Sequence, residues 1–552
     1  MSEKVATWKQ RVLLVLLGLS LLVPGVFSLP LIDRDEPRFS RAAVEMMENG
    51  NPVVPYFNGE YRFDKPPLTY WAMWPGLKIL GITELAVRLP SLIAAICCAL
   101  MIFSFGRRMG MRDGAAALAA AVWLSCLQVM IHGRLAVADM LLLAFLTLTM
   151  RALWELGEIA GGWRARICSR WYHVLWIAMG LGFLAKGPLA WVVPLLALLI
   201  MWVMERWRKL DQRGQASSLI SMWALALLPA LLIVALWGIP ALVQTHGLFY
   251  KVGIGTHVVA RGVEGFNKRV FIPGIYYLLV LPFFFAPWTA WLAQSFREAK
   301  STGRNQVFLV SWLLAPFTIF SFYATQLPHY ILPGYPALCL LMAMAVEKGA
   351  PGKSWLRWLL AGLPALVFSL AGLAMFWGQG PARNLDADFA SLLFWLGLFL
   401  LCLAIACIVV ALKRPWLAVL CMMLAAAAMQ GASVNAARCH AVRRLVAQVD
   451  GGLGNPASSG FSEPSMVWYG KKKWNFDPQL DPDAGLQVML CRRWRLDGKT
   501  FAALWRGETP VPVKDWRDKI PAGYAASAQT VRGWSTADSS WVELVYWQPR
   551  HD

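Results

Sequence analysis

Residues 387–412 read ADFASLLFWLGLFLLCLAIACIVVAL, an apolar run that contains a single charged residue, Asp388. A helix of about 20 residues crosses the roughly 30 Å of hydrocarbon in a bilayer, so this run is typical of a transmembrane helix. The whole chain of 552 residues is 58% hydrophobic, whereas about 45–50% is usual for soluble proteins. The sequence therefore indicates an integral membrane protein.

Similar runs recur along the chain and predict a polytopic α-helical membrane protein with about thirteen transmembrane helices. The expected positions are 11–30, 86–106, 114–130, 136–154, 172–185, 187–204, 217–240, 273–296, 306–325, 330–346, 355–377, 387–412 and 415–434. Charged residues follow the first run directly, and it has no small-residue cleavage site. We expect it to be a retained anchor and not a cleaved signal peptide.

Lysine and arginine indicate the orientation, because short cytoplasmic loops are enriched in both. Basic residues precede the first run, and the bias returns in every second loop: Arg107, Arg108, Arg112, Arg164, Arg166, Arg170, Arg206, Arg208, Lys209, Arg213, Arg297, Lys300, Arg304, Lys348, Lys353, Arg357, Lys413 and Arg414. The net charge of +20 is mostly this topological signal and does not indicate nucleic-acid binding. We expect a cytoplasmic N-terminus, periplasmic loops at 33–85 and 241–272, and a periplasmic C-terminus.

The composition changes near residue 435, where polar residues, glycine and proline become more frequent. Residues 1–434 are therefore expected to form the membrane domain, and 435–552 a periplasmic domain of α/β or mainly β structure. Alternation in LQVMLC (486–491) and WVELVYWQ (541–548) predicts strands. Two cysteines fall here, Cys439 and Cys491; an oxidising periplasm allows a disulfide, and their spacing leaves the pairing open.

The first outer loop opens with an unusual charged segment, DRDEPRFSRAAVEMMENGNPVVPYFNGEYRFDKPP (33–67). Its apolar residues recur at helical spacing and predict a short amphipathic helix that lies in the membrane interface: Phe39, Ala42, Ala43, Met46 and Met47. This helix would hold the acids Asp33, Asp35 and Glu36 at the membrane surface. The turns that follow lead to a second interfacial helix. An ordinary solvated loop is the alternative interpretation.

Other ionisable residues are predicted to emerge at the same membrane face. Asp139 lies about one turn inside the fourth run, where a carboxylate is costly unless it is paired or faces a polar cavity. Arg134 is a candidate structural partner for it. Lys186 stands between two apolar runs, where snorkelling to the interface is the alternative interpretation.

Two further segments contribute to this face. Loop 241–272 contains His257, Arg261, Lys268 and Arg269, and the segment TQLPHYILPGYPAL (325–338) contains His329, Tyr330 and Tyr335. Carboxylates alone would indicate a metal or a general base, and cations alone would indicate an anionic head group. The two together favour chemistry on a phosphorylated lipid.

The first loop also resembles that of bacterial members of the dolichyl-phosphate-mannose protein mannosyltransferase-like superfamily. Within it, the chain is most similar to the lipid A 4-amino-4-deoxy-L-arabinose transferase family. The resemblance continues through RLAVADMLLL, FLAKGPLA and QLPHYILPGYPAL, with a weaker match at EPSMVWYGKKKW (463–474). It implies a glycosyltransferase of the C-type fold, with about thirteen transmembrane helices, interfacial helices in the first loop and a periplasmic α/β domain.

The resemblance also implies roles for individual residues. Asp35 and Asp139 match the two important acids of the family, and Glu36 stands beside Asp35 as a further catalytic candidate. The positions that match carrier-phosphate ligands are Lys65, Arg261, Tyr330 and Lys186, with Tyr335 as an alternative to Tyr330. The reaction requires no cofactor, but Asp64 and His257 match the position of a structural divalent metal such as Zn²⁺.

The implied donor is a sugar on undecaprenyl phosphate, and the implied acceptor is lipid A or another periplasmic glycan. Transfer needs cations that stabilise the leaving phosphate, and in-line attack inverts the anomeric centre. A phosphate acceptor needs no general base, so Asp35 and Asp139 would position the acceptor or the sugar; a hydroxyl acceptor would need one of them to accept its proton.

The resemblance thus implies a modification of lipopolysaccharide that is associated with resistance to cationic peptides such as polymyxin. Two alternative functions remain. One is transfer of another sugar, such as mannose or galacturonic acid, to protein, core oligosaccharide or another glycan. The other is a flippase or transporter, which would predict discontinuous helices in inverted repeats and would not explain acids that gather at one face.

Overall fold

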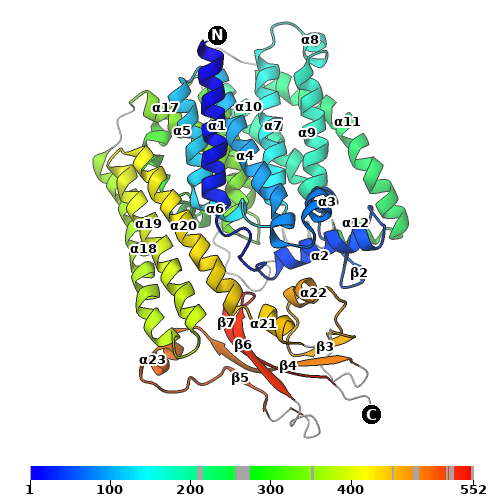
Figure 1. Cartoon of the computed structure of the whole chain (residues 1–552). Coiled ribbons are helices and arrows are strands. Elements are labelled where there is room, and N and C mark those ends of the chain that lie inside the picture. Colours follow the sequence, from blue (N-terminus) through cyan, green and yellow to red (C-terminus); the bar gives the residue numbers. More distant parts are fainter. Residues whose placement is uncertain are drawn as a thin grey trace.

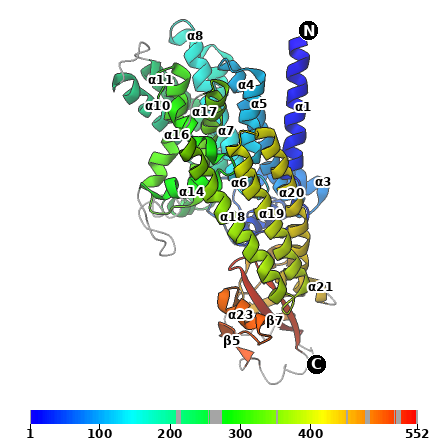
Figure 2. The same cartoon turned by 90° about the vertical axis from the view of Figure 1, so that its left-hand side faces the viewer.

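The computed structural model describes residues 2–207, 215–253, 255, 274–349, 353–449, 453–476, 484–517, 520 and 528–548. Long helices run side by side in a bundle, and a smaller unit of strands and short helices covers one end of it (Figures 1 and 2). The N-terminus lies at the opposite end of the bundle (Figure 1). Helix α20 ends at Cys439, and strands β3 to β7 follow it in the chain.

The bundle contains helices of very different length. They are α1 (Ser2–Leu22), α4 (Glu84–Arg108), α5 (Asp113–Ser125), α6 (Leu127–His132), α7 (Asp139–Glu158), α8 (Trp163–Ile167), α9 (Arg170–Lys186), α10 (Leu189–Trp207), α11 (Gln215–Gln244), α14 (Tyr276–Phe284), η3 (Trp288–Trp291), α15 (Leu292–Glu298), α16 (Arg304–Ser321), η4 (Pro328–Gly334), α17 (Tyr335–Glu347), α18 (Ser354–Ala382), α19 (Ala387–Ala411) and α20 (Pro415–Cys439).

This is a multi-pass membrane protein, but the predicted number of thirteen crossings is not confirmed. Within the described ranges, eight helices are long and apolar enough to span a membrane, or nine if one bent pair counts as a single span. That pair, α14 with η3 and α15, bends by 119° where a continuous helix was predicted at 273–296. The bend contains Pro287, which has no backbone N–H to continue a helix. Helices α1, α5, α9 and α16 also coincide with predicted runs.

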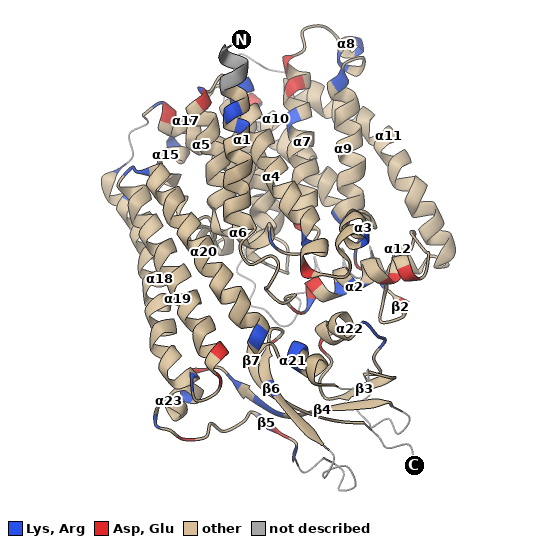
Figure 3. Ribbon diagram, viewed as in Figure 1, with Lys and Arg blue, Asp and Glu red and all other residues tan. Residues whose placement is uncertain are grey.

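The outer surface of the bundle is apolar, as contact with lipid requires. On α11, the side chains of Leu228, Leu232 and Leu236 are all exposed and recur at intervals of four residues, so they form one stripe along the helix. Lysine and arginine are frequent at the end of the bundle that carries the N-terminus and α8 (Figure 3).

The first loop folds into a layer across the other end of the bundle. Its elements are α2 (Asp35–Glu48), β1 (Tyr56–Phe57), β2 (Glu60–Tyr61) and α3 (Leu68–Leu80), and α12 (Leu248–Tyr250) lies beside it (Figure 1). Both predicted helices are present. The apolar stripe of α2 is buried from Phe39 to Met46, because it packs against α3 on one side and the C-terminal unit on the other.

The C-terminal unit is built on a five-stranded sheet with strand order β3-β4-β7-β6, to which β5 adds at β4. Its elements are α21 (Ala441–Gln448), β3 (Pro456–Ser459), α22 (Pro464–Gly470), β4 (Leu486–Arg495), α23 (Gly498–Trp505), β5 (Lys514–Asp515), β6 (Gln529–Ser535) and β7 (Ser540–Trp547). The two predicted strands are part of β4 and β7, which pair antiparallel. Strands β3 and β4 are parallel and α22 connects them, so the unit contains both helices and strands, as predicted.

The structure does not contain the disulfide that the sequence allowed. Cys439 and Cys491 are both buried and both free. Cys439 ends α20 and packs with Phe389 of α19, whereas Cys491 lies in β4 and packs with Val545 and Trp547. The two thiols therefore belong to different apolar clusters, and each behaves as a small buried hydrophobic group.

Specific hydrogen bonds dock the C-terminal unit onto the first loop. The Asn58 side chain donates to the carbonyl of Trp474 and accepts from its backbone N–H, at 2.9 and 2.8 Å. Asp33 accepts from the Ser465 backbone N–H at 2.8 Å and from the Thr536 hydroxyl at 3.0 Å. The unit thus holds the charged segment of the loop in a fixed position.

Candidate active site

Asp139 and Lys186 form the centre of the candidate site. Asp139 is the first residue of α7 and Lys186 is the last residue of α9, positions at which each charge is favoured by the helix dipole. The Lys186 ammonium donates to Asp139 Oδ1 at 2.5 Å, and each side chain is 14% exposed. The two residues that the sequence placed separately at this face are therefore one ion pair.

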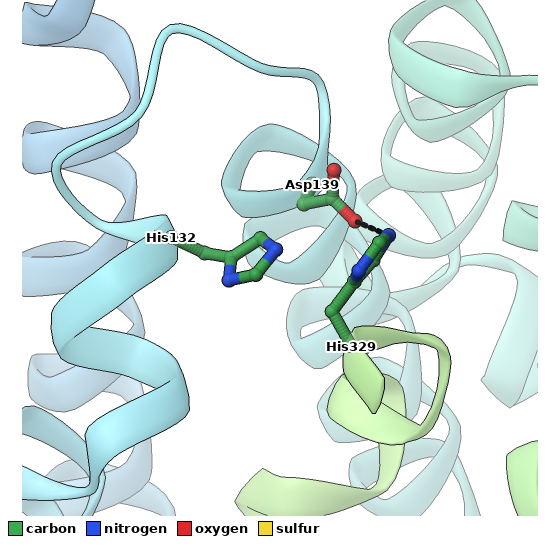
Figure 4. A group of neighbouring side chains, drawn as sticks. All are labelled: His132, Asp139 and His329. Carbon is green, nitrogen blue, oxygen red and sulfur yellow. Dashed lines mark ion pairs between the residues drawn. The ribbon is translucent and has the colours of Figure 1, made fainter. Parts of the chain in front are cut away.

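Two histidines complete the surroundings of Asp139 (Figure 4). His329 from η4 has its Nε2 atom 3.8 Å from Asp139 Oδ1. His132, the last residue of α6, lies against it, with 4.8 Å between the two ring centroids. Tyr330 follows His329, and the Lys186 ammonium lies 6.0 Å from the centre of its ring. Three regions that are far apart in sequence, 132–139, 186 and 329–330, thus meet at one carboxylate.

Arg134 does not pair with Asp139. Its guanidinium is buried and donates to the carbonyl oxygens of Leu22, at 3.2 Å, and Met130, at 3.3 Å, and to that of Leu21. It therefore ties the end of α1 to α6. The proposed structural partner of Asp139 was wrong, and Lys186 has that position, which also argues against simple snorkelling for the lysine.

A cavity of about 190 Å³ opens beside this centre. Its charged lining consists of Asp64, Lys65 and Lys186, and most of the remaining wall is apolar, with Phe63, Phe183, Trp237 and Phe249 among its residues. Lys65 and Lys186 come from different elements but share this cavity. Asp139, Lys186, His329 and Tyr330 line a second, much smaller cavity that is adjacent through Lys186.

Asp64 and Asp35 belong to a network of charges in the first loop. Asp64 forms ion pairs with Arg62 at 2.8 Å and with Lys65 at 3.3 Å. Asp35 is exposed at the start of α2 and interacts electrostatically with Arg38 and Arg62. Acids and bases alternate here, so the loop presents charges of both signs near the cavity, as the sequence predicted.

Glu36 has a different environment from Asp35. Its side chain is 1% exposed and accepts four hydrogen bonds, two from the Arg88 guanidinium, at 2.9 and 2.8 Å, and two from the backbone N–H groups of Ile32 and Ala136. Arg88 also donates to three carbonyl oxygens of the segment 26–30. Glu36 is therefore a structural group that fastens the loop to α4, which corrects its expected catalytic role.

The remaining predicted ligands have different outcomes. Tyr335 is fully buried in the bundle, and its ring packs on Phe285 with 5.1 Å between centroids. It does not line either cavity, so Tyr330 is the better candidate. Arg261 and His257 lie outside the described residues.

The metal site predicted at Asp64 and His257 stays a prediction. The Asp64 carboxylate already pairs with two cations, Arg62 and Lys65, and His257 is outside the described part of the chain. In the part that is described, a group of three nitrogen or oxygen ligands occurs elsewhere, at His132, Asp139 and His329.

Comparison with known proteins identifies the membrane region. Residues 12–248 match the family described as dolichyl-phosphate-mannose-protein mannosyltransferase. This part of the chain, less than half of its length, is similar to that family. It contains the first loop with Asp35 and Lys65, together with Asp139 and Lys186, so the match covers most of the candidate site.

Several curated proteins are similar to a longer part of the chain. The undecaprenyl phosphate-alpha-4-amino-4-deoxy-L-arabinose arabinosyl transferase of Edwardsiella ictaluri is 31% identical over 379 residues, which are 67% of this chain and 65% of that protein. The protein of the same name from Pseudomonas aeruginosa PAO1 is 32% identical over 342 residues, 61% of this chain and 59% of that protein. The chain thus matches less than two thirds of the length of these relatives.

The fold as a whole is that of a solved structure. ArnT from Cupriavidus metallidurans, in a crystal structure bound to undecaprenyl phosphate, superposes with a TM-score of 0.70 over 97% of each chain, at 18% identity. The apo form of the same protein gives 0.68. The similarity therefore includes the C-terminal unit, which the family match does not reach.

Some residues of the site were missed in the sequence. His132, Arg62 and Arg38 were not predicted, and neither was Arg88. For Arg88 and His132 a signal existed, because each is an ionisable residue within or next to an apolar run. Arg62 had no such signal, since it stands among other charges in a loop.

Proposed function

We propose that the chain is a membrane glycosyltransferase that moves a sugar from an undecaprenyl-phosphate carrier to an acceptor in the periplasm. The proposed sugar is 4-amino-4-deoxy-L-arabinose and the proposed acceptor is a lipid A phosphate. The observation that carries the proposal is the apolar cavity with Lys65 and Lys186 on its wall, directly beside the Asp139 carboxylate. The names of the similar curated proteins support the choice of donor and sugar.

The cavity suits the donor. Its aromatic and aliphatic wall offers a surface for the first isoprene units of a lipid carrier, and its two lysines offer a site for the phosphate. Transfer breaks the bond between the anomeric carbon and a phosphate oxygen, so negative charge develops on that oxygen. Cations placed there stabilise the transition state more than the ground state. We assign this role to Lys65 and Lys186, with Arg261 and Tyr330 as further ligands.

The acids suit the other side of the reaction. Asp139 is held by Lys186 and faces the small cavity, and Asp35 is exposed above the loop network. A phosphate acceptor is already an anion, so these acids would bind the sugar or its amino group. A hydroxyl acceptor would instead transfer its proton to one of them. Both routes invert the anomeric centre, because the acceptor attacks opposite the leaving phosphate.

The proposed location is the bacterial inner membrane, with the site and the C-terminal unit in the periplasm. The basic residues support this orientation, because they gather at the end of the bundle opposite the C-terminal unit (Figure 3) and cytoplasmic loops are enriched in them. The carrier and the acceptor would then enter the site from the outer leaflet.

Mass spectrometry of lipid A and outer glycans tests this function. Extracts from cells with and without the protein should differ by an aminopentose on a lipid A phosphate. The same difference on another glycan, or with another sugar, would keep the glycosyltransferase and replace the substrate. No difference in any outer glycan, together with no use of an undecaprenyl-phosphate sugar by the purified protein, would contradict the proposal and favour lipid transport.

A further inference from the structure

We propose that His132, Asp139 and His329 form a binding site for a divalent transition metal, with Zn²⁺ as the favoured ion. The inference concerns the same part of the molecule as the proposed function. Metal binding is measured without any sugar transfer, however, so either proposal can fail alone.

The geometry of the three side chains carries the inference. One ligand atom from each residue lies within 4.8 Å of the other two, and the side chains point toward one another (Figure 4). Tetrahedral Zn²⁺ with bonds of about 2.0–2.1 Å places its ligand atoms roughly 3.3 Å apart. The Nε2 atom of His329 is already 3.8 Å from Asp139 Oδ1. Small side-chain rotations therefore close the site.

The hydrogen bonding of His132 orients this ligand. Its Nδ1 atom lies 3.2 Å from the backbone carbonyl oxygen of Gln128. A carbonyl oxygen only accepts hydrogen bonds, so Nδ1 carries the proton, and Nε2 keeps a lone pair. The Gln128 side chain fits the same assignment: its amide lies 3.0 Å from Nδ1, and its buried Oε1 has no hydrogen-bond partner. Exchanging the amide O and N lets Oε1 accept from Nδ1. A backbone carbonyl on the second nitrogen is typical of metal-bound histidine.

The rigidity of the supporting elements favours a defined site. His132 ends α6, Asp139 begins α7, and His329 lies in η4, so each ligand projects from a different element that the bundle core fixes. His132 is 8% exposed, and His329 and Asp139 are 22% and 14% exposed at the side chain. The site is thus largely shielded from water but remains accessible from the cavity side.

Lys186 determines how tightly the metal binds. Its ammonium holds Asp139 Oδ1 at 2.5 Å, the same oxygen that lies 3.8 Å from His329 Nε2, so a metal must share this carboxylate with the ammonium or displace it. Both arrangements place two cations on one carboxylate, and their repulsion weakens metal binding. Removal of the Lys186 charge should therefore tighten it. Three protein ligands leave the fourth position of Zn²⁺ open, and the small cavity beside Asp139 and His329 gives an oxygen ligand, such as a phosphate oxygen, a path to it.

The test measures metal on the full-length protein, purified in detergent through a histidine-free affinity tag. The protein is stripped with a chelator, incubated with ZnCl₂, desalted and analysed by inductively coupled plasma mass spectrometry. We expect about one Zn²⁺ per chain in the wild type, and background levels in His329→Ala and in the double variant His132→Ala/His329→Ala. His173→Ala is the matched control, because His173 is exposed on α9; it should retain the metal.

Two further measurements do not depend on loss of metal from a variant, which misfolding could also cause. Co²⁺ added to the stripped wild type should give the d–d absorption of a four-coordinate nitrogen and oxygen site, and the Lys186→Ala variant should bind Zn²⁺ about tenfold more tightly. The proposal is overturned if the wild type retains no metal, if the double variant retains it, if Asp64→Ala removes it while His329→Ala does not, or if Lys186→Ala fails to tighten binding.

Discussion

Glu36 and Asp139 are both acids held by a basic residue, yet their surroundings differ in kind. Glu36 is 1% exposed and accepts four hydrogen bonds, two from the fully buried Arg88 guanidinium and two from backbone N–H groups. Asp139 has one flexible ammonium, a nearby imidazole and an adjacent cavity. The number of fixed donors separates a structural acid from one that can meet a substrate, which proximity to the site alone does not.

Replacement of Asp139, the acid beside the cavity, should have the largest effect on activity. In Asp139→Asn we expect sugar transfer to fall by about 10²–10⁴-fold, because the neutral amide neither orients Lys186 nor accepts a proton. The thermal midpoint should fall less than in Glu36→Gln, because Lys186 faces a cavity whereas Arg88 is fully buried. Initial rates of transfer by purified protein test this.

Asp388→Asn is the matched control for that variant. Asp388 also lies in the first turn of a long membrane helix, α19, and pairs with arginine, but it is far from the site in sequence and lines neither cavity. Its activity should stay within about twofold of the wild type; an equal loss in both variants would show a general effect of removing helix-end charge.

Replacement of Glu36, the fully buried acid, should affect stability instead. Glu36→Gln leaves the buried Arg88 guanidinium without its counter-charge, and loss of one partner of a buried pair costs about 3–5 kcal/mol. Thermal unfolding in detergent should show a large drop in the midpoint. Glu48→Gln removes an exposed partner of Arg41 and should cost less than about 1 kcal/mol. If Glu36→Gln kept its stability and lost only activity, the assignment of the two acids would be reversed.

Replacement of Lys65, a proposed ligand of the carrier phosphate, should have an effect of intermediate size, on the affinity for the carrier lipid. Lys65→Ala should weaken binding of undecaprenyl phosphate about ten- to a hundredfold, because a hydrogen bond to a charged group contributes about 1.5–3 kcal/mol. Binding is measurable by the change in thermal midpoint with added lipid. Lys78→Ala, which removes an exposed lysine in the last turn of α3, should leave the affinity unchanged.

Asp33, a third acid, is buried against neutral hydrogen-bond donors. Its titration should have the smallest of these effects, on the pH dependence of stability. Burial raises its pKa to about 6, and burial with the nearby charges of Asp33 and Asp538 raises the pKa of Glu463 in the C-terminal unit to about 7. The docked state binds protons more readily than the unfolded chain, so stability should rise as the pH falls through 7 and 6, and the gain should level off near the ordinary values of about 4.

Thermal midpoints between pH 7.5 and 5.5 measure this dependence. We expect a gain of about 1–2 kcal/mol for the wild type and a much flatter profile for Asp33→Asn/Glu463→Gln. Asp515→Asn changes an exposed acid of the same unit and should keep the wild-type slope. A wild type that becomes less stable over this interval would contradict the raised pKa values.

Much of this arrangement followed from local sequence patterns. The apolar runs, the stripe of α2 and the alternation in β4 and β7 depend on residues near one another in the chain, and they were predicted. The sequence predicted that Asp139 and Lys186 lie at the same membrane face, but not that they form an ion pair. Their match to family positions added the prediction that both take part in the same reaction.

The errors came from contacts between distant segments. Glu36 and Arg88 are 52 positions apart, and nothing near Glu36 distinguishes it from Asp35. Arg134 stood close to Asp139 in sequence but is held by carbonyls of α1, while the true partner is 47 positions away. Likewise, an apolar run at 273–296 does not reveal that its helix bends by 119°.

The most direct test of the account is transfer by purified protein from an undecaprenyl-phosphate-linked aminoarabinose to lipid A, with Asp139→Asn and Glu36→Gln compared at a temperature where all three proteins are folded. We expect transfer by the wild type, at least about a hundredfold loss in Asp139→Asn, and measurable transfer by Glu36→Gln. Wild-type rates in folded Asp139→Asn, or no transfer by the wild type to any lipid or glycan acceptor, would rule out the proposed role of Asp139 or the proposed reaction.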